Sequence, residues 1–491
     1  MMAIVVSIDA GTTGVRSFAI DEQGQQVALS YKEFKQYFPR PGWVEHDPNE
    51  IWESVQSTLT ELKGLIYDPV AAIGITNQRE TVLAWSLRSG EPICNAVVWQ
   101  DRRTSSRCDE LLENGYLDQI RQATGLVIDP YFSGTKIEWL LKNGMVELSP
   151  DLAFGTIDSW IIWKLTGGAS YATDVSNASR TLLYDIHDGS WSPELCQLFG
   201  VPESSLPEVL PSSGSFGLTA QTTALGADIP ISGVAGDQQS ALFGQACLEP
   251  GMTKNTYGTG SFILMNAGTD CPQPVEGLLT TVAWDLGNGP TYALEGSVFV
   301  TGAAIQWLRD GLGIIKEASE ISDLAASVED TGDVFFVPAF AGLGSPWWDS
   351  RARGTIMGLT GGTGRGHLAR AVVESIAFQT RDVVEAMSKA GGTPVHEMRV
   401  DGGAAVMDLL LQIQADQLGV RVARPVITET TALGAAMLAG LAEGVWNKPE
   451  EISAAWQLDK AFDPRDNRVA CDASHRNWRR AVERSRNWAL D

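Results

Sequence analysis

The sequence predicts an α/β fold made of two similar halves that enclose a cleft. Short β-branched runs alternate with helical patterns of apolar residues, which is typical of α/β proteins. Each half also contains two extended runs separated by a glycine-rich turn, at 3–20 and again at 255–266. This repeat indicates an internal duplication, and a cleft is expected between the two copies.

Length and composition exclude several classes of protein. The chain has 491 residues, of which 44% are hydrophobic and 20% charged, so it is neither disordered nor collagen-like. Acidic side chains outnumber basic ones by 60 to 36, and the net charge of −24 repels nucleic acids and anionic membranes. No run of 18 apolar residues occurs, and the start of the chain lacks the basic region of a signal peptide. We therefore expect a cytoplasmic protein with no nucleic-acid partner and no membrane insertion.

The elements of the first half follow from local patterns. Residues 3–20 form two strands around the turn at 9–14. Asp-Pro-Asn-Glu at 47–50 places an N-cap acid before proline and begins a helix, because apolar residues follow it at helical spacing. The apolar run 71–76 reads as a buried strand that ends on the polar cluster 77–80.

The second half repeats this outline. Residues 255–266 predict a second strand–turn–strand unit, and 365–389 predicts a long helix. Residues 399–419 combine a strand end, a Gly-Gly turn and an apolar helix. No long linker interrupts the chain, so we place the domain boundary before Gly251, with one domain at 1–250 and the other at 251–491.

The two glycine-rich turns are candidate phosphate sites. Asp9 to Arg16 and Thr256 to Phe262 would each direct backbone N–H groups and hydroxyls toward one point, a shape that binds phosphate oxygens. A simple tight hairpin explains the first turn alone at least as well. Two such turns, one in each half, favour a nucleotide polyphosphate held from both sides.

Three further segments carry candidate chemistry, each with a structural alternative. Asp237 precedes a helical pattern, where it is either an N-cap or a general base. Arg79 and Glu80 stand at a strand end and suit the hydroxyls of a small polyol, unless they form only a surface ion pair. Gly402 and Gly403 allow a close approach of backbone to a ligand, or a plain turn.

These segments together resemble the glycerol kinases of the carbohydrate kinase family. The resemblance runs from residue 3 to about 455. The motifs that carry it are DAGTTGVR (9–16), GWVEHDP (42–48), ITNQRET (75–81), VVWQDRR (97–103), DPYFSGTK (129–136), GDQQSALFG (236–244), KNTYGTGSF (254–262), YALEGSVFVTGAAIQWLRD (292–310) and VDGGA (400–404). It implies an actin-like ATPase fold of the ribonuclease H type, with two duplicated domains closing on ATP and substrate. The implied reaction is the phosphorylation of glycerol to sn-glycerol 3-phosphate by ATP and Mg²⁺.

The resemblance also implies roles for individual residues. Asp237 would be the catalytic base, and Asp9 and Asp237 would hold Mg²⁺. The glycerol-binding residues would be Arg79, Glu80, Trp99, Tyr131, Asp237, Gln238 and Phe262. The ATP-binding residues would be Thr12, Thr13, Arg16, Thr259 and Gly260 at the phosphates and Gly302, Gln306, Gly403 and Met407 at the nucleoside. A homo-oligomer, either a dimer or a tetramer, is also expected.

The chain departs from the glycerol kinase pattern at three places, and other functions remain open. Ala10 replaces the usual Gln, Gly14-Val15 replaces Ser-Ser or Ser-Thr, and Met407 replaces an Asn near the adenine. A kinase for another polyol or sugar, similar to xylulokinase or gluconokinase, is the first alternative, because those enzymes share the fold and the phosphate turns. A non-catalytic actin-like protein is the second, and the polar cluster around Arg79 argues against it.

Overall fold

The computed structural model describes residues 3–489, and its first sheet has five strands in the order β13-β5-β1-β2-β3. The strands β1, β2 and β3 form an antiparallel meander, whereas β5 pairs with β1 in parallel and β13 pairs with β5 in parallel. The strands of this sheet are β1 (Ile4–Ala10), β2 (Gly14–Ile20), β3 (Gln26–Glu33), β5 (Val70–Asn77) and β13 (Ile231–Gly236). Every residue of β1 is buried, as expected for a central strand.

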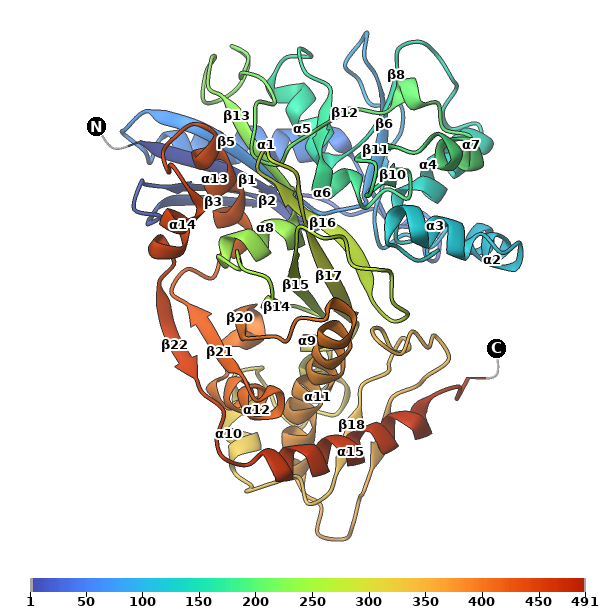
Figure 1. The fold of residues 1–491 in the computed structure, drawn as a ribbon, viewed down its shortest axis with the longest axis vertical. Helices are drawn as coiled ribbons and strands as arrows, with labels where there is room; N and C mark the ends of the chain where they lie inside the picture. The colour runs from blue at the N-terminus through green and yellow to red at the C-terminus, as the bar shows by residue number, and fades with distance from the viewer. Residues whose placement is uncertain (1–2, 490–491) are drawn as a thin grey trace.

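A second sheet repeats this topology in the other half of the chain. Its order is β16-β17-β15-β14-β20-β21-β22, in which β14, β15 and β17 form the meander and β20 and β21 add in parallel. The strands are β14 (Met252–Tyr257), β15 (Ser261–Gly268), β16 (Leu279–Asp285), β17 (Pro290–Val298), β20 (Glu397–Gly402), β21 (Arg421–Pro425) and β22 (Leu458–Phe462). The predicted internal duplication is therefore confirmed (Figure 1).

The remaining strands form smaller sheets, and the largest of these belongs to the first half of the chain. It has the order β4-β7-β6-β8, with β4 (Glu45–His46), β6 (Val82–Ser86), β7 (Ala96–Val97) and β8 (Leu152–Thr156). Three two-stranded pairs join β9 (Ala172–Asp174) to β12 (Glu208–Leu210), β10 (Tyr184–Asp185) to β11 (Ser190–Trp191), and β18 (Phe335–Val337) to β19 (Thr355–Met357). None of these was predicted from the sequence.

The helices cover both main sheets. In the first half they are α1 (Pro48–Lys63), α2 (Ser105–Glu113), α3 (Leu117–Thr124), α4 (Ser133–Lys142), α5 (Ile157–Leu165), α6 (Val175–Ala178), α7 (Pro193–Phe199) and α8 (Asp237–Gly244). In the second half they are α9 (Gly302–Gln306), α10 (Glu320–Ala326), α11 (Arg365–Gly391), α12 (Asp408–Leu418), α13 (Thr430–Ala442), α14 (Pro449–Ala455) and α15 (Arg468–Ser485). The predicted helix start at 47–50 is confirmed, because the Asp47 carboxylate accepts a hydrogen bond from the Asn49 amide at 2.8 Å.

One helix of the second half packs on the first sheet. Helix α13 lies against β5, β13 and α8, and Figure 1 shows it beside the N-terminal strands. The helices α13 and α8 approach so closely that a Cβ added at Gly434 would lie 1.9 Å from the carbonyl oxygen of Ser240. The domain boundary near residue 250 stays a prediction. A division at that residue would separate α13 from the first sheet, against which it packs.

Candidate active site

The predicted site residues of the first half gather at one edge of the first sheet. Asp9 lies near the end of β1, Arg79 and Glu80 follow β5, and Asp237 follows β13. These three strands are adjacent and parallel, so their carboxyl ends meet at the same edge, where α/β sheets bind their ligands. Strand pairing sets Asp9 opposite Thr76, and Thr76 opposite Ala235.

Asp237 is the first residue of α8, and the N-cap position belongs to Gly236. The Asp237 side chain does not cap the helix, because within residues 3–489 the only backbone amide it accepts from is that of its neighbour Gln238, at 2.7 Å. The N-cap alternative is therefore wrong. The carboxylate is 30% exposed and lies 3.2 Å from Nε of Arg79. Burial raises the pKa of Asp237 and Arg79 partly offsets this rise, so the carboxylate is a better proton acceptor than an exposed Asp.

Arg79 and Glu80 are not a surface pair, because only 2% and 1% of these residues are exposed. The guanidinium of Arg79 donates to the hydroxyl of Tyr131 at 3.2 Å and to the carboxylate of Glu295 at 2.5 and 3.1 Å. Glu80 has a φ of 62°, a left-handed conformation that is strained for a side chain of this kind. The interpretation as an exposed ion pair is therefore wrong, and the strain is of the kind found at ligand sites.

Aromatic rings complete this region from both halves of the molecule. The rings of Trp99 and Tyr131 meet edge to face with centroids 5.5 Å apart. Phe262 enters from β15, and its ring centroid lies 6.0 Å from the guanidinium carbon of Arg79. The indole N–H of Trp99 donates to the hydroxyl of Thr12 at 3.0 Å, so the first glycine-rich turn is tied to this region. The structure thus brings together polar groups and rings suited to a small polyol.

Three buried charged residues of the site were missed by the sequence analysis: Arg180, Lys254 and Glu295. Lys254 donates to Oε1 of Gln238 and to the hydroxyl of Thr256 at 3.0 Å. Burial lowers the pKa of Lys254 to about 8, against the opposing charges of Asp401 and Asp237. A signal was available for Glu295, which is a charged residue inside a mostly apolar strand pattern, whereas Lys254 stands among the polar residues of Met252–Tyr257.

The first glycine-rich turn, between β1 and β2, combines small residues with one arginine. Thr12 is half-buried and Thr13 is exposed. Arg16 lies between two carboxylates, 3.2 Å from Asp9 and 2.7 Å from Glu429. The turn therefore presents hydroxyls and a cation near the strand ends, as a phosphate site requires.

The second glycine-rich turn, between β14 and β15, is held by its own backbone and by α9. The amide of Gly258 donates to the carbonyl oxygen of Gly260 at 2.8 Å, and the amide of Gly302 donates to that of Gly258 at 3.0 Å. Gly258 and Thr259 are exposed, and a Cβ at Gly260 would lie 2.2 Å from the carbonyl oxygen of Val298. Only glycine fits position 260, and the turn joins directly to the start of α9.

The predicted nucleoside residues divide into two groups. Gln306 and Gly403 are exposed, and Gln306 immediately precedes a π-helical turn at Trp307–Gly311, a feature frequent at functional sites. Met407, in contrast, is only 7% exposed and packs in the core of the second half. Asp408 is paired with Arg424 and Lys460, at 3.0 and 2.6 Å. The role of Met407 at the nucleoside stays a prediction, and its thioether contributes to the core in this structure.

Asp9 and Asp237 suit a magnesium ion that is shared with a nucleotide. Across residues 3–489, no three His, Cys, Asp or Glu side chains converge so that they could hold a metal by themselves. Mg²⁺ is commonly held by one or two carboxylates together with phosphates and waters. Burial raises the pKa of Asp9 to about 7, with Arg16 opposing the rise and Asp237 adding to it, so the two carboxylates are electrostatically coupled. Such a pair of oxygen ligands fits the ion.

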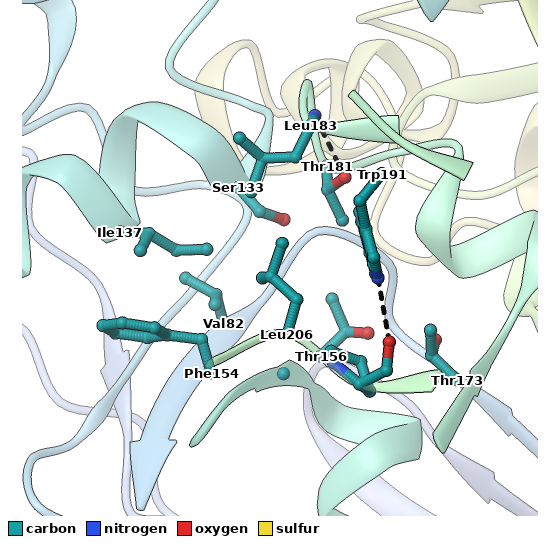
Figure 2. Close-up of a pocket in the computed structure, with 12 residues that line it drawn as sticks. Val82, Ser133, Ile137, Phe154, Thr156, Thr173, Thr181, Leu183, Trp191 and Leu206 are labelled. Carbon is teal, nitrogen blue, oxygen red and sulfur yellow. Dashed lines mark hydrogen bonds between the residues drawn. The ribbon is translucent and has the colours of Figure 1, made fainter. Parts of the chain in front are cut away.

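A small cavity beside the site is too small to hold the substrate (Figure 2). Its volume is about 10 Å³, which is room for one water at most. Its lining includes Ser133, Leu206 and Trp191, and it includes none of the predicted site residues. The Ser133 hydroxyl donates to the carbonyl oxygen of Glu80 at 2.9 Å, so this cavity is a packing feature behind the strained residue.

Family models match nearly the whole chain. The N-terminal domain model of the FGGY family of carbohydrate kinases matches residues 4–244, and the C-terminal domain model matches 253–443. The chain belongs to the FGGY family of carbohydrate kinases. The predicted resemblance and the two-domain actin-like fold are thereby confirmed.

Several relatives are similar over their full length. The chain is 55% identical to glycerol kinase 2 of Thermotoga maritima, covering 99% of each protein. It is also 55% identical to glycerol kinase of Trichlorobacter lovleyi, covering 99% of this chain and all of the relative. The crystal structure of Plasmodium falciparum glycerol kinase with ADP superimposes with a TM-score of 0.93 at 36% identity, covering 99% and 98% of the two chains. A gluconate kinase of Lactobacillus acidophilus, at 23% identity and a TM-score of 0.89, shares the fold.

Proposed function

We propose that this enzyme phosphorylates glycerol with ATP to give sn-glycerol 3-phosphate. The observation that carries the proposal is the position of Asp237, a partly exposed carboxylate beside the buried pair Arg79 and Glu80. The full-length relatives at 52–55% identity are named glycerol kinases, and the similar structure at 36% identity was solved with ADP. Both support glycerol as the substrate, and the structure with ADP also supports an adenine nucleotide.

In the proposed mechanism the chain orients glycerol and accepts one proton. Arg79 and Glu80 bind neighbouring hydroxyls, Tyr131 and Gln238 add polar contacts, and Trp99 and Phe262 flank the carbon chain. Asp237 removes the proton of the terminal hydroxyl as the bond to phosphorus forms. Mg²⁺, held through Asp9 and Asp237, would neutralise charge on the phosphates.

The ATP contacts would come from both halves. The first turn would offer the hydroxyls of Thr12 and Thr13 and the guanidinium of Arg16, and the second would offer Thr259 and Gly260. Gly302, Gln306 and Gly403 would line the nucleoside. Because the two turns belong to different sheets, both can reach one polyphosphate only when the halves approach each other.

The substrate is tested by ADP release on a panel of glycerol, xylulose, ribulose and gluconate. We expect kcat/KM to be highest for glycerol, since Arg79 and Glu80 offer paired groups for two neighbouring hydroxyls, and Trp99 and Phe262 offer rings for a short carbon chain. A higher kcat/KM for any of the three sugars or sugar acids would assign the protein to another branch of the family.

Domain closure gives a second expected result. Glycerol together with a non-hydrolysable ATP analogue should reduce the radius of gyration measured by small-angle X-ray scattering, because hinge closure excludes water from the phosphates. Glycerol alone is the control for ligand binding without the nucleotide. An unchanged radius with both ligands at saturation would contradict a closing motion.

Location and assembly are proposed from the whole chain. Between residues 3 and 489, no helix combines the length and apolar character that a membrane crossing needs. We propose a cytoplasmic enzyme that assembles as a dimer or tetramer. Light scattering on a size-exclusion column would determine the mass of the assembly.

A further inference from the structure

A closed ring of four alternating charges lies under the proposed glycerol site. This charge ring consists of Arg79, Glu80, Arg180 and Glu295. Nε of Arg180 lies 2.7 Å from Glu80 and its Nη2 lies 3.1 Å from Glu295. Nη1 of Arg79 lies 2.5 Å from Glu295, and its Nε lies 3.7 Å from Glu80. Two members, Arg180 and Glu295, have no role in the mechanism proposed above.

The charge ring joins the two halves of the molecule and is fully buried. Arg79 and Glu80 follow β5 of the first sheet, Arg180 follows α6, and Glu295 belongs to β17 of the second sheet. All four residues are at most 2% exposed. In the β15–β17 pairing, Glu295 stands opposite Leu264, two residues from Phe262, so it shares the face of the sheet that carries this ring to the site.

Glu295 fixes the plane of the Arg79 guanidinium. Its two carboxylate oxygens accept from both terminal nitrogens of Arg79, a bidentate arrangement that permits one orientation. In that orientation Nε of Arg79 faces Asp237. Without the charge of Glu295, the carboxylates left beside Arg79 would be those of Asp237 and Glu80, which lie 3.2 and 3.7 Å from its Nε. We expect the guanidinium then to turn toward the proposed base and away from the substrate.

Arg180 has the corresponding effect on Glu80. It engages Oε1 of Glu80, whereas Oε2 makes no hydrogen bond to any residue in 3–489. The free oxygen is thus available to a substrate hydroxyl. Burial raises the pKa of Glu80 and the two arginines lower it, so their charges favour an ionised acceptor.

We propose that Glu295 and Arg180 are positioning residues, which orient Arg79 and Glu80 for two neighbouring hydroxyls of glycerol. The inference rests on the proposed function, because it concerns the same substrate. It adds that glycerol recognition requires a carboxylate from the second half of the chain, which does not itself touch glycerol.

The test is the kinetics of Glu295→Gln, which keeps the shape of the side chain and removes its charge. We expect KM for glycerol to rise about 10- to 100-fold, because Arg79 would no longer be oriented toward the substrate hydroxyl. KM for ATP should change less than about threefold. Arg180→Lys keeps a charge but loses the fork, so it should raise KM for glycerol in the same direction by a smaller factor. It also covers the case in which Glu295→Gln does not fold.

Asp382→Asn is the matched control. Asp382 is also a buried carboxylate, bonded to His475 at 2.8 Å and to Trp478 at 2.7 Å, in the second half and away from the site. The substitution Asp382→Asn should lower the unfolding temperature of the protein without changing KM for glycerol. Equal rises of both KM values in Glu295→Gln, or an unchanged KM for glycerol in both ring variants, would overturn the proposal and leave the ring a structural link. The rate of the wild-type protein on glycerol tests the proposed function separately. If another polyol were the preferred substrate, the KM of the two ring variants relative to the wild type would be measured with that polyol.

Discussion

Replacement of Asp237 by Asn is expected to lower kcat for glycerol by about 10² to 10⁴. Asn keeps the size of the side chain and an oxygen that can accept from the Gln238 amide, but it cannot take the proton of the attacking hydroxyl. Burial raises the pKa of Asp237, so its charge is unfavourable in the fold. The variant should therefore be at least as stable as the wild type in thermal unfolding.

Asp47→Asn is the control for this substitution. Asp47 is a true N-cap of α1, and Asn caps helices about as well as Asp. Activity and unfolding temperature should both stay near the wild-type values. If Asp237→Asn kept more than about a tenth of the wild-type kcat, a proton-accepting role for Asp237 would be contradicted.

Replacement of Gly434 by Ala is expected to destabilise the protein by about 1–3 kcal/mol or more. The added Cβ would lie 1.9 Å from the carbonyl oxygen of Ser240 and 2.9 Å from the amide nitrogen of Gly244, both backbone atoms of α8. The two helices would have to separate, and α8 carries Asp237 at its first position. The free energy of unfolding in denaturant measures the first effect, and kcat measures the second.

The sign of this change decides between two explanations. Ala is favoured over Gly in a helix by about 1 kcal/mol, so without a clash the substitution would stabilise α13. Gly361→Ala is the control, because nothing lies within 4 Å of the Cβ that it would add. A more stable Gly434→Ala variant would show that α13 and α8 are farther apart in solution than in this structure.

Local patterns in the sequence predict the frame of the fold well. The apolar run of β1 and the capped start of α1 depend on neighbours in the chain, and so do the two glycine-rich turns. The polar cluster at the end of β5 could be proposed as a ligand site for the same reason, since the proposal needed only one strand and its last residues. The motif resemblance then connected these separate features to one reaction.

The remaining parts depend on partners far apart in the chain. Arg79 and Glu295 are 216 residues apart, and Arg180 and Glu80 are 100 apart. A single charged residue in a strand pattern gives no indication of which residue will neutralise it. The packing of α13 on the first sheet is likewise a contact between distant parts of the chain, and the apolar sequence of α13 does not indicate which sheet it covers. The sequence also left open whether Asp237 caps the helix, and the structure places Gly236 at the N-cap position instead.

The return of α13 to the first sheet has a consequence for synthesis on the ribosome. The strands of that sheet are the first to be made, whereas the helix that covers them ends at Ala442. The emerging N-terminal half must therefore keep part of an apolar surface uncovered until most of the chain has been translated, and contacts of such long range form slowly. A fragment ending near residue 250 would expose this surface permanently, so chaperone binding and aggregation are the expected fate of prematurely terminated chains.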